Sequence, residues 1–280
     1  MLPAIIHICL ERRLVFYFLT FFKKKLYVII RLFLYIGLVK LKKRNIMEKY
    51  KLTDETINVN GITLYRIEAL KDFSDVHEGD KGGFIEHERN LSQDNDCWVY
   101  EKAMVYGNAM VHDDAMAFGN AKVCGNASVY DYASVCGNAK VYGDASVFGD
   151  AMVRGNASVY DYASVYGNAS VCGDAEVYSI AEVFDNAKVF SNAEVCGNAW
   201  VHGGAEVCGD ARIESMRDYI VFKNWWSSGR YFTWTRSNNM WRVGCFYGSG
   251  EELIQKAYKD SDKSGDEYKA VVEFVESRLN

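Results

Sequence analysis

Two histidines are the side chains best suited to proton transfer near neutral pH. The pKa of imidazole lies close to neutrality, so the side chain can accept a proton as a general base. His112 and His202 are 90 residues apart and occupy equivalent positions of the repeat described below. In that repeat, 90 residues correspond to five coils, so the two imidazoles cannot cooperate in one site. Each is a candidate base on its own, in a position that aromatic residues mostly fill.

The eight cysteines favour neither a metal centre nor disulfides. The chain has no Cys-x-x-Cys pair and no Cys/His cluster with zinc spacing, so no metal site is expected. Cys136 and Cys172 would lie two coils apart, about 10 Å at the strand spacing of the repeat. A disulfide requires the two α-carbons to lie within about 7 Å of each other. Unpaired thiols are typical of a reducing compartment, which predicts a cytoplasmic location. No histidine follows His202, so Cys245 is not expected to form a catalytic Cys–His pair.

A third group of candidates lies near the C-terminus, where arginines alternate with aromatic residues. On a two-residue alternation, one face of a strand carries aromatic rings flanked by guanidinium groups. Such a face can bind a carbohydrate, a single strand or a protein. The same rings could instead form the core of a small module that covers the end of the repeat. The candidate partner-binding residues are Arg230, Phe232, Trp234, Arg236, Trp241 and Arg242.

Both histidines are positioned by a repeat of six residues. Ala occupies every sixth position from Ala103 to Ala211, nineteen times without a slip. Val follows two residues later from Val105 to Val207, interrupted only by Ala117, and Ile213 closes the series. The unit is illustrated by Val141-Tyr142-Gly143-Asp144-Ala145-Ser146. We name its six places the Val, ring, Gly, Asn, Ala and post-Ala positions.

The residue types of the unit predict a short strand followed by a sharp turn. Val is β-branched and favours extended backbone, and Val and Ala are the steadily apolar pair that should face inward. The Gly position holds Gly in twelve of eighteen units, and the Asn position holds Asn or Asp in fourteen of eighteen. These residues tolerate positive φ best, and a period of six does not match the 3.6 residues of a helical turn. Three hexads then make an 18-residue coil of an all-β solenoid.

This pattern resembles the hexapeptide repeat of bacterial left-handed parallel β-helix proteins. The resemblance covers residues 97–213 and implies the left-handed winding, which the spacing does not establish. The segment before the repeat, with Gly82-Gly83-Phe84-Ile85-Glu86 and Cys97-Trp98-Val99-Tyr100, is similar to the start of uncharacterised bacterial and prophage proteins of this kind. It implies a phage, prophage or bacterial origin and a capping role, but no particular reaction.

The ring positions predict three outward ladders, read at every eighteenth residue. Their members are mostly Tyr and Phe, and they include Tyr142, Tyr160 and Tyr178 in one ladder and Phe148, Tyr166 and Phe184 in another. Rings at strand spacing can stack and stiffen the solenoid. Alternatively, an exposed apolar surface of this kind marks a partner or a self-association site.

The resemblance also implies an enzymatic alternative, because many hexapeptide-repeat proteins transfer acetyl or acyl groups from CoA. In that family a histidine acts as base in a cleft between the subunits of a trimer, and an inserted loop usually completes the cleft. His112 and His202 are the weak candidates for that role. The repeat has no insertion between residues 97 and 213, which argues against it.

Flanking segments should cover the two open ends of the solenoid. We expect an N-terminal cap over residues 47–96, with a strand at Thr63–Ile67, and a C-terminal α+β module over residues 214–280. In that module, Tyr231–Arg236 and Met240–Phe246 predict a hairpin. Helices are expected at Gly250–Asp260 and Asp266–Leu279, each with an apolar stripe.

The chain is divided by charge, and its overall net charge of −5 describes neither part. Residues 1–46 contain ten Lys or Arg and one acid, a net charge of +9, so the rest carries −14. The acidic part argues against nucleic acid as a partner. The basic, apolar leader is too interrupted for a membrane span, although it could act as a surface anchor if it is translated. We expect that translation starts at Met47.

These observations predict a non-catalytic β-helical scaffold or binding protein that presents a C-terminal recognition module. A protein or carbohydrate partner is expected, without a cofactor or a metal. The alternative is a transferase that uses acetyl- or acyl-CoA and acts as a homotrimer.

Overall fold

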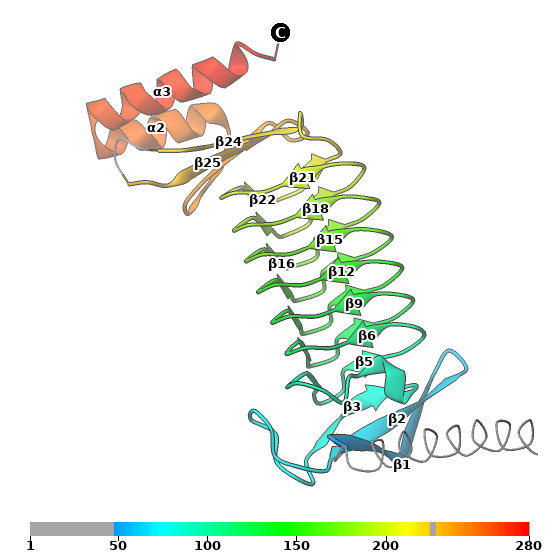
Figure 1. Cartoon of the computed structure of the whole chain (residues 1–280). Coiled ribbons are helices and arrows are strands. Elements are labelled where there is room, and N and C mark those ends of the chain that lie inside the picture. The colour runs from blue at the N-terminus through cyan, green and yellow to red at the C-terminus, as the bar shows by residue number, and fades with distance from the viewer. Residues whose placement is uncertain (1–47, 225–227, 280) are drawn as a thin grey trace, which may run out of the picture. The chain divides into compact units, whose positions relative to one another are not determined.

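The six-residue repeat folds into three parallel sheets, as its period predicts. In the computed structural model, which describes residues 48–224 and 228–279, a two-residue strand recurs every six residues from β4 (Trp98–Val99) to β23 (Arg212–Ile213) (Figure 1). Strands 18 residues apart pair in parallel, as Ser134 does with Met152. Each coil therefore has three strands, and the predicted parallel β-solenoid is confirmed. Its left-handed winding stays a prediction, and the proposed leader and the start at Met47 lie outside the described residues.

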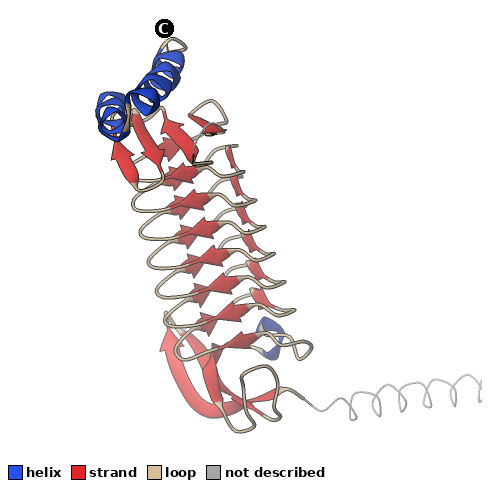
Figure 2. Ribbon diagram, turned by 90° about the vertical axis from the view of Figure 1, so that its left-hand side faces the viewer, coloured by secondary structure: helices blue, strands red, loops and turns tan. Residues whose placement is uncertain are grey.

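Figure 2 shows the strands of successive coils stacked in register. One sheet has the order β1-β2-β3-β5-β8-β11-β14-β17-β20-β23, with β1 (Tyr50–Val59), β2 (Ile62–Ala69), β3 (Lys81–Ile85), β5 (Met104–Val105), β8 (Lys122–Val123), β11 (Lys140–Val141), β14 (Ser158–Val159), β17 (Glu176–Val177) and β20 (Glu194–Val195) before β23. A second has the order β22-β19-β16-β13-β10-β7-β4, with β22 (Glu206–Val207), β19 (Lys188–Val189), β16 (Ser170–Val171), β13 (Met152–Val153), β10 (Ser134–Val135) and β7 (Met116–Ala117). The third has the order β21-β18-β15-β12-β9-β6, with β21 (Trp200–Val201), β18 (Glu182–Val183), β15 (Ser164–Val165), β12 (Ser146–Val147), β9 (Ser128–Val129) and β6 (Met110–Val111).

The interior of the solenoid is built from small side chains. Every Ala position from Ala103 to Ala211 and every Val position from Val105 to Ile213 is at most 1% exposed. Burying this apolar surface is the main favourable contribution to folding. Most ring and post-Ala side chains lie outside, so the interior between Ala103 and Ile213 is apolar, and the candidate bases lie on the outer surface.

The turns use positive φ at all eighteen Gly positions from Gly107 to Gly209, including the six that lack glycine. A Cβ built at Gly125 would lie 2.9 Å from the backbone nitrogen and oxygen of Gly143 in the next coil, so glycine permits close stacking. Where Asp stands instead, its carboxylate finds a partner, as Asp131 Oδ2 does by accepting the Gly149 N–H at 3.1 Å. The predicted turn chemistry is confirmed.

Backbone hydrogen bonds that involve turn residues also join successive coils. The N–H groups of each coil donate to carbonyls of the next, as Ser146 does to Ala163 at 3.0 Å and Phe148 to Val165 at 3.0 Å. At the first coil some of these carbonyls, and at the last coil some of these N–H groups, have no neighbouring coil to bind. A buried backbone group without a partner is costly, so both ends of the solenoid require caps.

The N-terminal cap supplies donors. Strand β3 donates from the Phe84 N–H to Ala103 O at 2.9 Å, and the 3-10 turn Glu88–Asn90 places the Asn90 amide against Ala109 O at 2.8 Å. The Lys49 ammonium, which is 1% exposed, donates to Cys97 O at 2.8 Å and contacts Cys97 Sγ at 3.2 Å. Burial lowers the pKa of Lys49, and burial raises the pKa of the Cys97 thiol.

The C-terminal module supplies hydroxyl acceptors. Its antiparallel sheet has the order β24 (Tyr219–Lys223), β25 (Tyr231–Thr235), β26 (Met240–Val243) and β27 (Phe246–Gly248). Thr233 Oγ1 accepts the Glu206 N–H at 2.9 Å, and Ser237 Oγ accepts the Arg212 N–H at 2.7 Å. The sheet lies directly on the last coil, because a Cβ at Gly204 would meet the Tyr231 ring at 2.3 Å.

Two helices, α2 (Gly250–Asp260) and α3 (Asp262–Glu276), complete the module, so the predicted α+β character is confirmed. Ser249 caps α2 by accepting the Glu252 N–H at 3.3 Å. No helix of the described residues is long and apolar enough to cross a membrane.

Candidate functional site

His112 lies on the outer surface of an early coil and is held by a carboxylate. Its Nδ1 is 2.9 Å from Asp113 Oδ2. Asp113 occupies a Gly position with a φ of 56° and does not bind the next coil as Asp131 does. Nδ1–H donation to a carboxylate fixes the tautomer and leaves the Nε2 lone pair available to accept a proton.

His202 stands at the other end of the same ladder without such support. Its ring stacks on Phe184 at 5.0 Å, but no carboxylate of the described residues binds it. The next residue is Gly203, whose position in the repeat corresponds to that of Asp113. The two histidines are therefore equivalent in ladder position but not in chemistry, and only His112 has the orienting group of a base.

Two of the three outward ladders contain stacks of rings. From His112 the stack runs through Tyr130, Phe148, Tyr166 and Phe184 to His202, with centroids 4.8–5.0 Å apart. In the neighbouring ladder, Tyr142, Tyr160 and Tyr178 stack at 4.9 and 5.0 Å. Within these stacks each ring covers the face of its neighbour. The stacks therefore present ring edges, rather than ring faces, to solvent.

The tyrosine hydroxyls bind glutamates of the same surface. Tyr166 donates to Glu182 at 2.7 Å and Tyr160 to Glu176 at 2.8 Å. Burial and the neighbouring Glu182 carboxylate raise the pKa of Tyr166 to about 12. Burial and Glu176 raise the pKa of Tyr160 as well. These tyrosines stay protonated near neutral pH and act as structural donors.

Three of the predicted partner-binding residues are in the core of the C-terminal module. Phe232, Trp234 and Trp241 are at most 2% exposed. The prediction that these three side chains contact a partner is therefore wrong. They belong to one hydrophobic cluster with Leu253 of α2 and Val275 of α3. The apolar stripes of the two helices pack on the face of the sheet that carries these three rings.

The three arginines of that prediction have different surroundings. Arg242 binds Glu206 at 3.0 Å and lies over the Phe190 ring, so it joins the module to the solenoid. Arg236 is exposed and donates its backbone N–H to Asp218. Arg230 is exposed and lines a small hollow beside α2.

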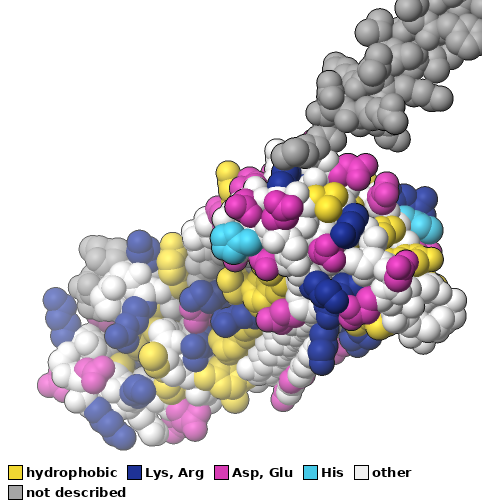
Figure 3. Space-filling model, turned by 90° about the horizontal axis from the view of Figure 1, so that it is seen from below, with side chains coloured by type: hydrophobic (Ala, Val, Ile, Leu, Met, Phe, Trp, Pro, Cys, Tyr) yellow, Lys and Arg dark blue, Asp and Glu magenta, His cyan; other side chains and the backbone are white. Residues whose placement is uncertain are grey.

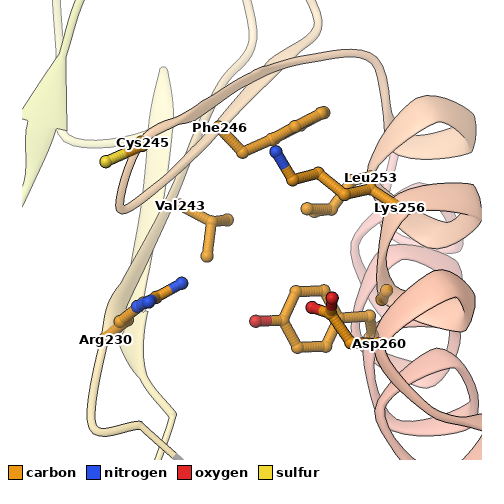
Figure 4. Close-up of a pocket in the computed structure, with 9 residues that line it drawn as sticks. Arg230, Val243, Cys245, Phe246, Leu253, Lys256 and Asp260 are labelled. Carbon is orange, nitrogen blue, oxygen red and sulfur yellow. The ribbon is translucent and has the colours of Figure 1, made fainter.

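Figure 4 shows this hollow, with Arg230 on one side, in the loop immediately before β25, and with Lys256 and Asp260 of α2 on the other. Its volume is about 60 Å³, the share of about two molecules of liquid water. The exposed thiol of Cys245 lies at its border. The hollow is too small for a substrate of metabolite size.

A larger hollow lies on the third sheet near its C-terminal end. Ile180, Trp200 and Met216 line it, and its volume is about 590 Å³. None of these three residues was predicted to belong to a site, although Ile180 and Trp200 interrupt the repeat. Met216 follows the repeat, so the period of six does not predict where its side chain lies.

Charge and metal-binding groups do not mark a further site. Figure 3 shows basic and acidic side chains intermixed on the face seen from below. Among residues 48–224 and 228–279, no group of three or more His, Cys, Asp and Glu side chains is arranged to hold a metal ion. The absence of a nucleic-acid partner stays a prediction.

Comparison with known proteins adds one partial similarity. No family model matches the chain. A stretch of 73 residues, 23% of this chain, is 36% identical to the uncharacterized acetyltransferase YdcK of Escherichia coli (strain K12). The match spans only 22% of the length of YdcK.

Proposed function

We propose that this protein is a transferase that uses acetyl- or acyl-CoA as its donor, with His112 as its general base. The observation that carries the proposal is the contact between His112 Nδ1 and Asp113 Oδ2 at 2.9 Å. The partial similarity to a protein named as an acetyltransferase supports the same reaction class.

The chemistry follows from the orientation of the imidazole. Nε2 of His112 takes the proton from an acceptor hydroxyl or amine as that group attacks the thioester carbonyl. The C–S bond of the thioester then breaks, and the departing CoA sulfur receives the proton as a thiol. Asp113 stabilises the imidazolium that forms between these two steps.

The stacked ladder acts as a positioning element for the base. Tyr130 stacks on the His112 ring at 5.0 Å with an interplanar angle of 4°, which limits rotation of the imidazole. A base held in one orientation is more effective than a mobile one. The repeat has no inserted loop to wall the donor site, so under this proposal a neighbouring copy in a homotrimer closes the cleft beside His112.

The test compares the two ends of the ladder. CoA thiol release from acetyl-CoA is measured with a panel of amine and hydroxyl acceptors for the wild type, His112→Asn and His202→Asn. We expect His112→Asn to lower kcat/KM by about 10²–10⁴-fold and His202→Asn to change it by less than about twofold. Equal activity of the wild type and His112→Asn would contradict the assignment.

Asp113→Asn tests the orienting group. Asn tolerates the φ of 56° at this position, so the turn should be kept. We expect a loss of about 10-fold or more in kcat and an altered pH–rate profile, because the amide can no longer stabilise the imidazolium. An unchanged profile would show that Asp113 does not act through His112.

One observation favours a second candidate, a non-catalytic scaffold. The repeat runs from residue 97 to residue 213 without an insertion, and both ends are capped by flanking segments that satisfy backbone groups. Such a solenoid is a rigid spacer in its own right. The scaffold predicts that neither histidine substitution affects binding of the physiological partner and that acetyl-CoA does not bind.

A further inference from the structure

The regularity of the solenoid makes departures from the repeat informative. Of the nineteen post-Ala positions from Met104 to Arg212, Trp200 is the one that is aromatic. Of the eighteen Asn positions, four depart from Asn or Asp: Tyr132, Tyr162, Ile180 and Gly204. Gly204 is explained by the C-terminal cap, since Tyr231 occupies the space of its missing side chain.

Ile180 stands at a position where a polar side chain can link two coils. Several pairs of Asn positions are linked in this way, as Asn138 and Asn156 are by the Asn138 amide donating to Asn156 Oδ1 at 3.0 Å. An isoleucine cannot make this bond, and here its side chain is 59% exposed. The apolar residue therefore lacks a role in the core and in the amide ladder.

Two of the departures, Ile180 and Trp200, meet in the larger hollow with Met216. Trp200 is 46% exposed and Met216 is 51% exposed, so three large apolar side chains are presented together. Tyr162, one coil before Ile180, is 68% exposed and extends the apolar strip. A group of large apolar side chains that are exposed together is typical of a binding surface.

The indole of Trp200 is held in place before any ligand arrives. Phe184 packs against it with its ring at 75° and a centroid distance of 6.5 Å. The carbonyl of Trp200 accepts the Tyr219 hydroxyl at 2.9 Å, which fixes the backbone. β21 ends its sheet, and the backbone N–H of Trp200 donates to none of the described residues.

The polar rim identifies the chemistry of the ligand. Glu182 supplies an acceptor, Arg217 a donor, and Asn198 both. One carboxylate and one guanidinium give the hollow no net charge, so a polyanion gains little there. A purely apolar ligand would leave these polar groups without partners.

We propose that this hollow is a carbohydrate-binding site in which a sugar ring packs its C–H face on Trp200. Hydroxyl groups both donate and accept, which matches the mixed rim of Glu182, Asn198 and Arg217. Ile180 and Met216 cover the apolar edges of the ring. The site lies almost five coils from His112, about 23 Å along the solenoid at the strand spacing, so it binds a saccharide away from the proposed base.

The test uses an array of neutral, N-acetylated and uronic-acid saccharides, followed by titration of the bound glycans. Trp200→Ser places at this position a residue that the repeat commonly has there, so the fold should be kept. We expect it to weaken binding at least 10-fold, and Ile180→Asn to weaken it about threefold or more. The matched control is Tyr132→Asn, which restores the repeat outside the hollow and should leave binding unchanged.

Two results would overturn the site. One is the absence of saturable binding by the wild type to any saccharide of the array at millimolar concentration. The other is glycan binding that Trp200→Ser and Ile180→Asn leave unchanged while thermal unfolding shows that both are folded. His112→Asn should retain glycan binding, and Trp200→Ser should retain acetyl-CoA binding, so failure of this site and failure of the proposed function are distinguishable.

Discussion

The solenoid and the C-terminal module bury apolar side chains of very different size. In the solenoid the buried side chains are Val and Ala, and the shape comes from the backbone, with cross-coil hydrogen bonds and a positive φ in every hexad. In the module the buried side chains are large, with Phe232, Trp234 and Trp241 packed between a sheet and two helices. The solenoid therefore depends on many equal small contributions, whereas the module depends on a few large ones.

Because of this difference, a functional residue is easier to recognise in the solenoid than in the module. In the solenoid every position has eighteen or so equivalents, so a residue out of pattern, such as Trp200, is visible at once. In the module no position repeats, and a ring that looks exposed on an alternating strand can be covered by an element far along the chain. Four substitutions sharpen this comparison, from the largest expected effect to the smallest.

Trp241→Ala should be the most damaging change, because it opens a cavity in the core of the module. We expect a loss of about 3–5 kcal/mol in the free energy of unfolding, measured with chemical denaturant. Phe274→Ala is the control, since its side chain is 56% exposed and the cost should be below about 0.5 kcal/mol. Similar costs for the two variants would contradict the aromatic core.

Gly125→Ala tests the backbone of the solenoid. The residue has a φ of +73°, and an added Cβ would lie 2.9 Å from backbone atoms of Gly143. We expect a loss of about 2–3 kcal/mol from the left-handed conformation together with the clash. Gly203→Ala is the control: its φ is +66° but nothing lies within 4 Å, so only about 1 kcal/mol should be lost.

Thr233→Val tests the boundary between the two regions. The substitution keeps the shape of a side chain that is 1% exposed but removes the acceptor of the Glu206 N–H. We expect a loss of about 1–2 kcal/mol, because a buried donor is left without a partner. Thr63→Val on the exposed surface of β2 should be nearly neutral, and equal effects would exclude hydroxyl capping of the last coil.

Glu206→Gln probes the charge at the same boundary. Burial opposes ionisation, but the hydrogen bonds from Lys188 and Arg242 prevail and lower the pKa of Glu206. A lowered carboxyl pKa stabilises the folded state above its ordinary value of 4.5, and this contribution is lost as the pH falls through the folded-state pKa. We expect a difference of about 1 kcal/mol between wild type and variant at pH 7 that vanishes in acid. A constant difference would assign the effect to packing.

The fold of the solenoid could be predicted because one pattern specifies strand, turn and register together. The same Val, Ala and Gly positions recur in every hexad, so each hexad independently predicts the same backbone geometry. Even where Asp131 or Ser179 stands at a Gly position, the residue adopts positive φ. Local signals also succeeded in the module, where the helix predicted at Gly250–Asp260 has these bounds. The second helix begins at Asp262 rather than Asp266, because Ser261 caps it by accepting the Ser264 N–H.

The candidate site was less accessible, because it depends on contacts that a position in the repeat does not specify. Sequence treats His112 and His202 alike, yet the neighbour of one is Asp113 and that of the other is Gly203. That difference was a usable signal, although its meaning depends on a turn that brings the carboxylate to Nδ1. The hollow at Trp200 was beyond prediction for another reason: Met216 and Arg217 come from the segment after the repeat.

Titration of the full chain with acetyl-CoA tests the central claim most directly. The proposed transferase predicts saturable binding below millimolar concentration, with one molecule bound per subunit, in the wild type and in His112→Asn. A scaffold without enzymatic activity predicts no binding. The absence of a saturable heat signal at millimolar acetyl-CoA, from protein whose thermal unfolding shows it to be folded, would contradict the transferase assignment.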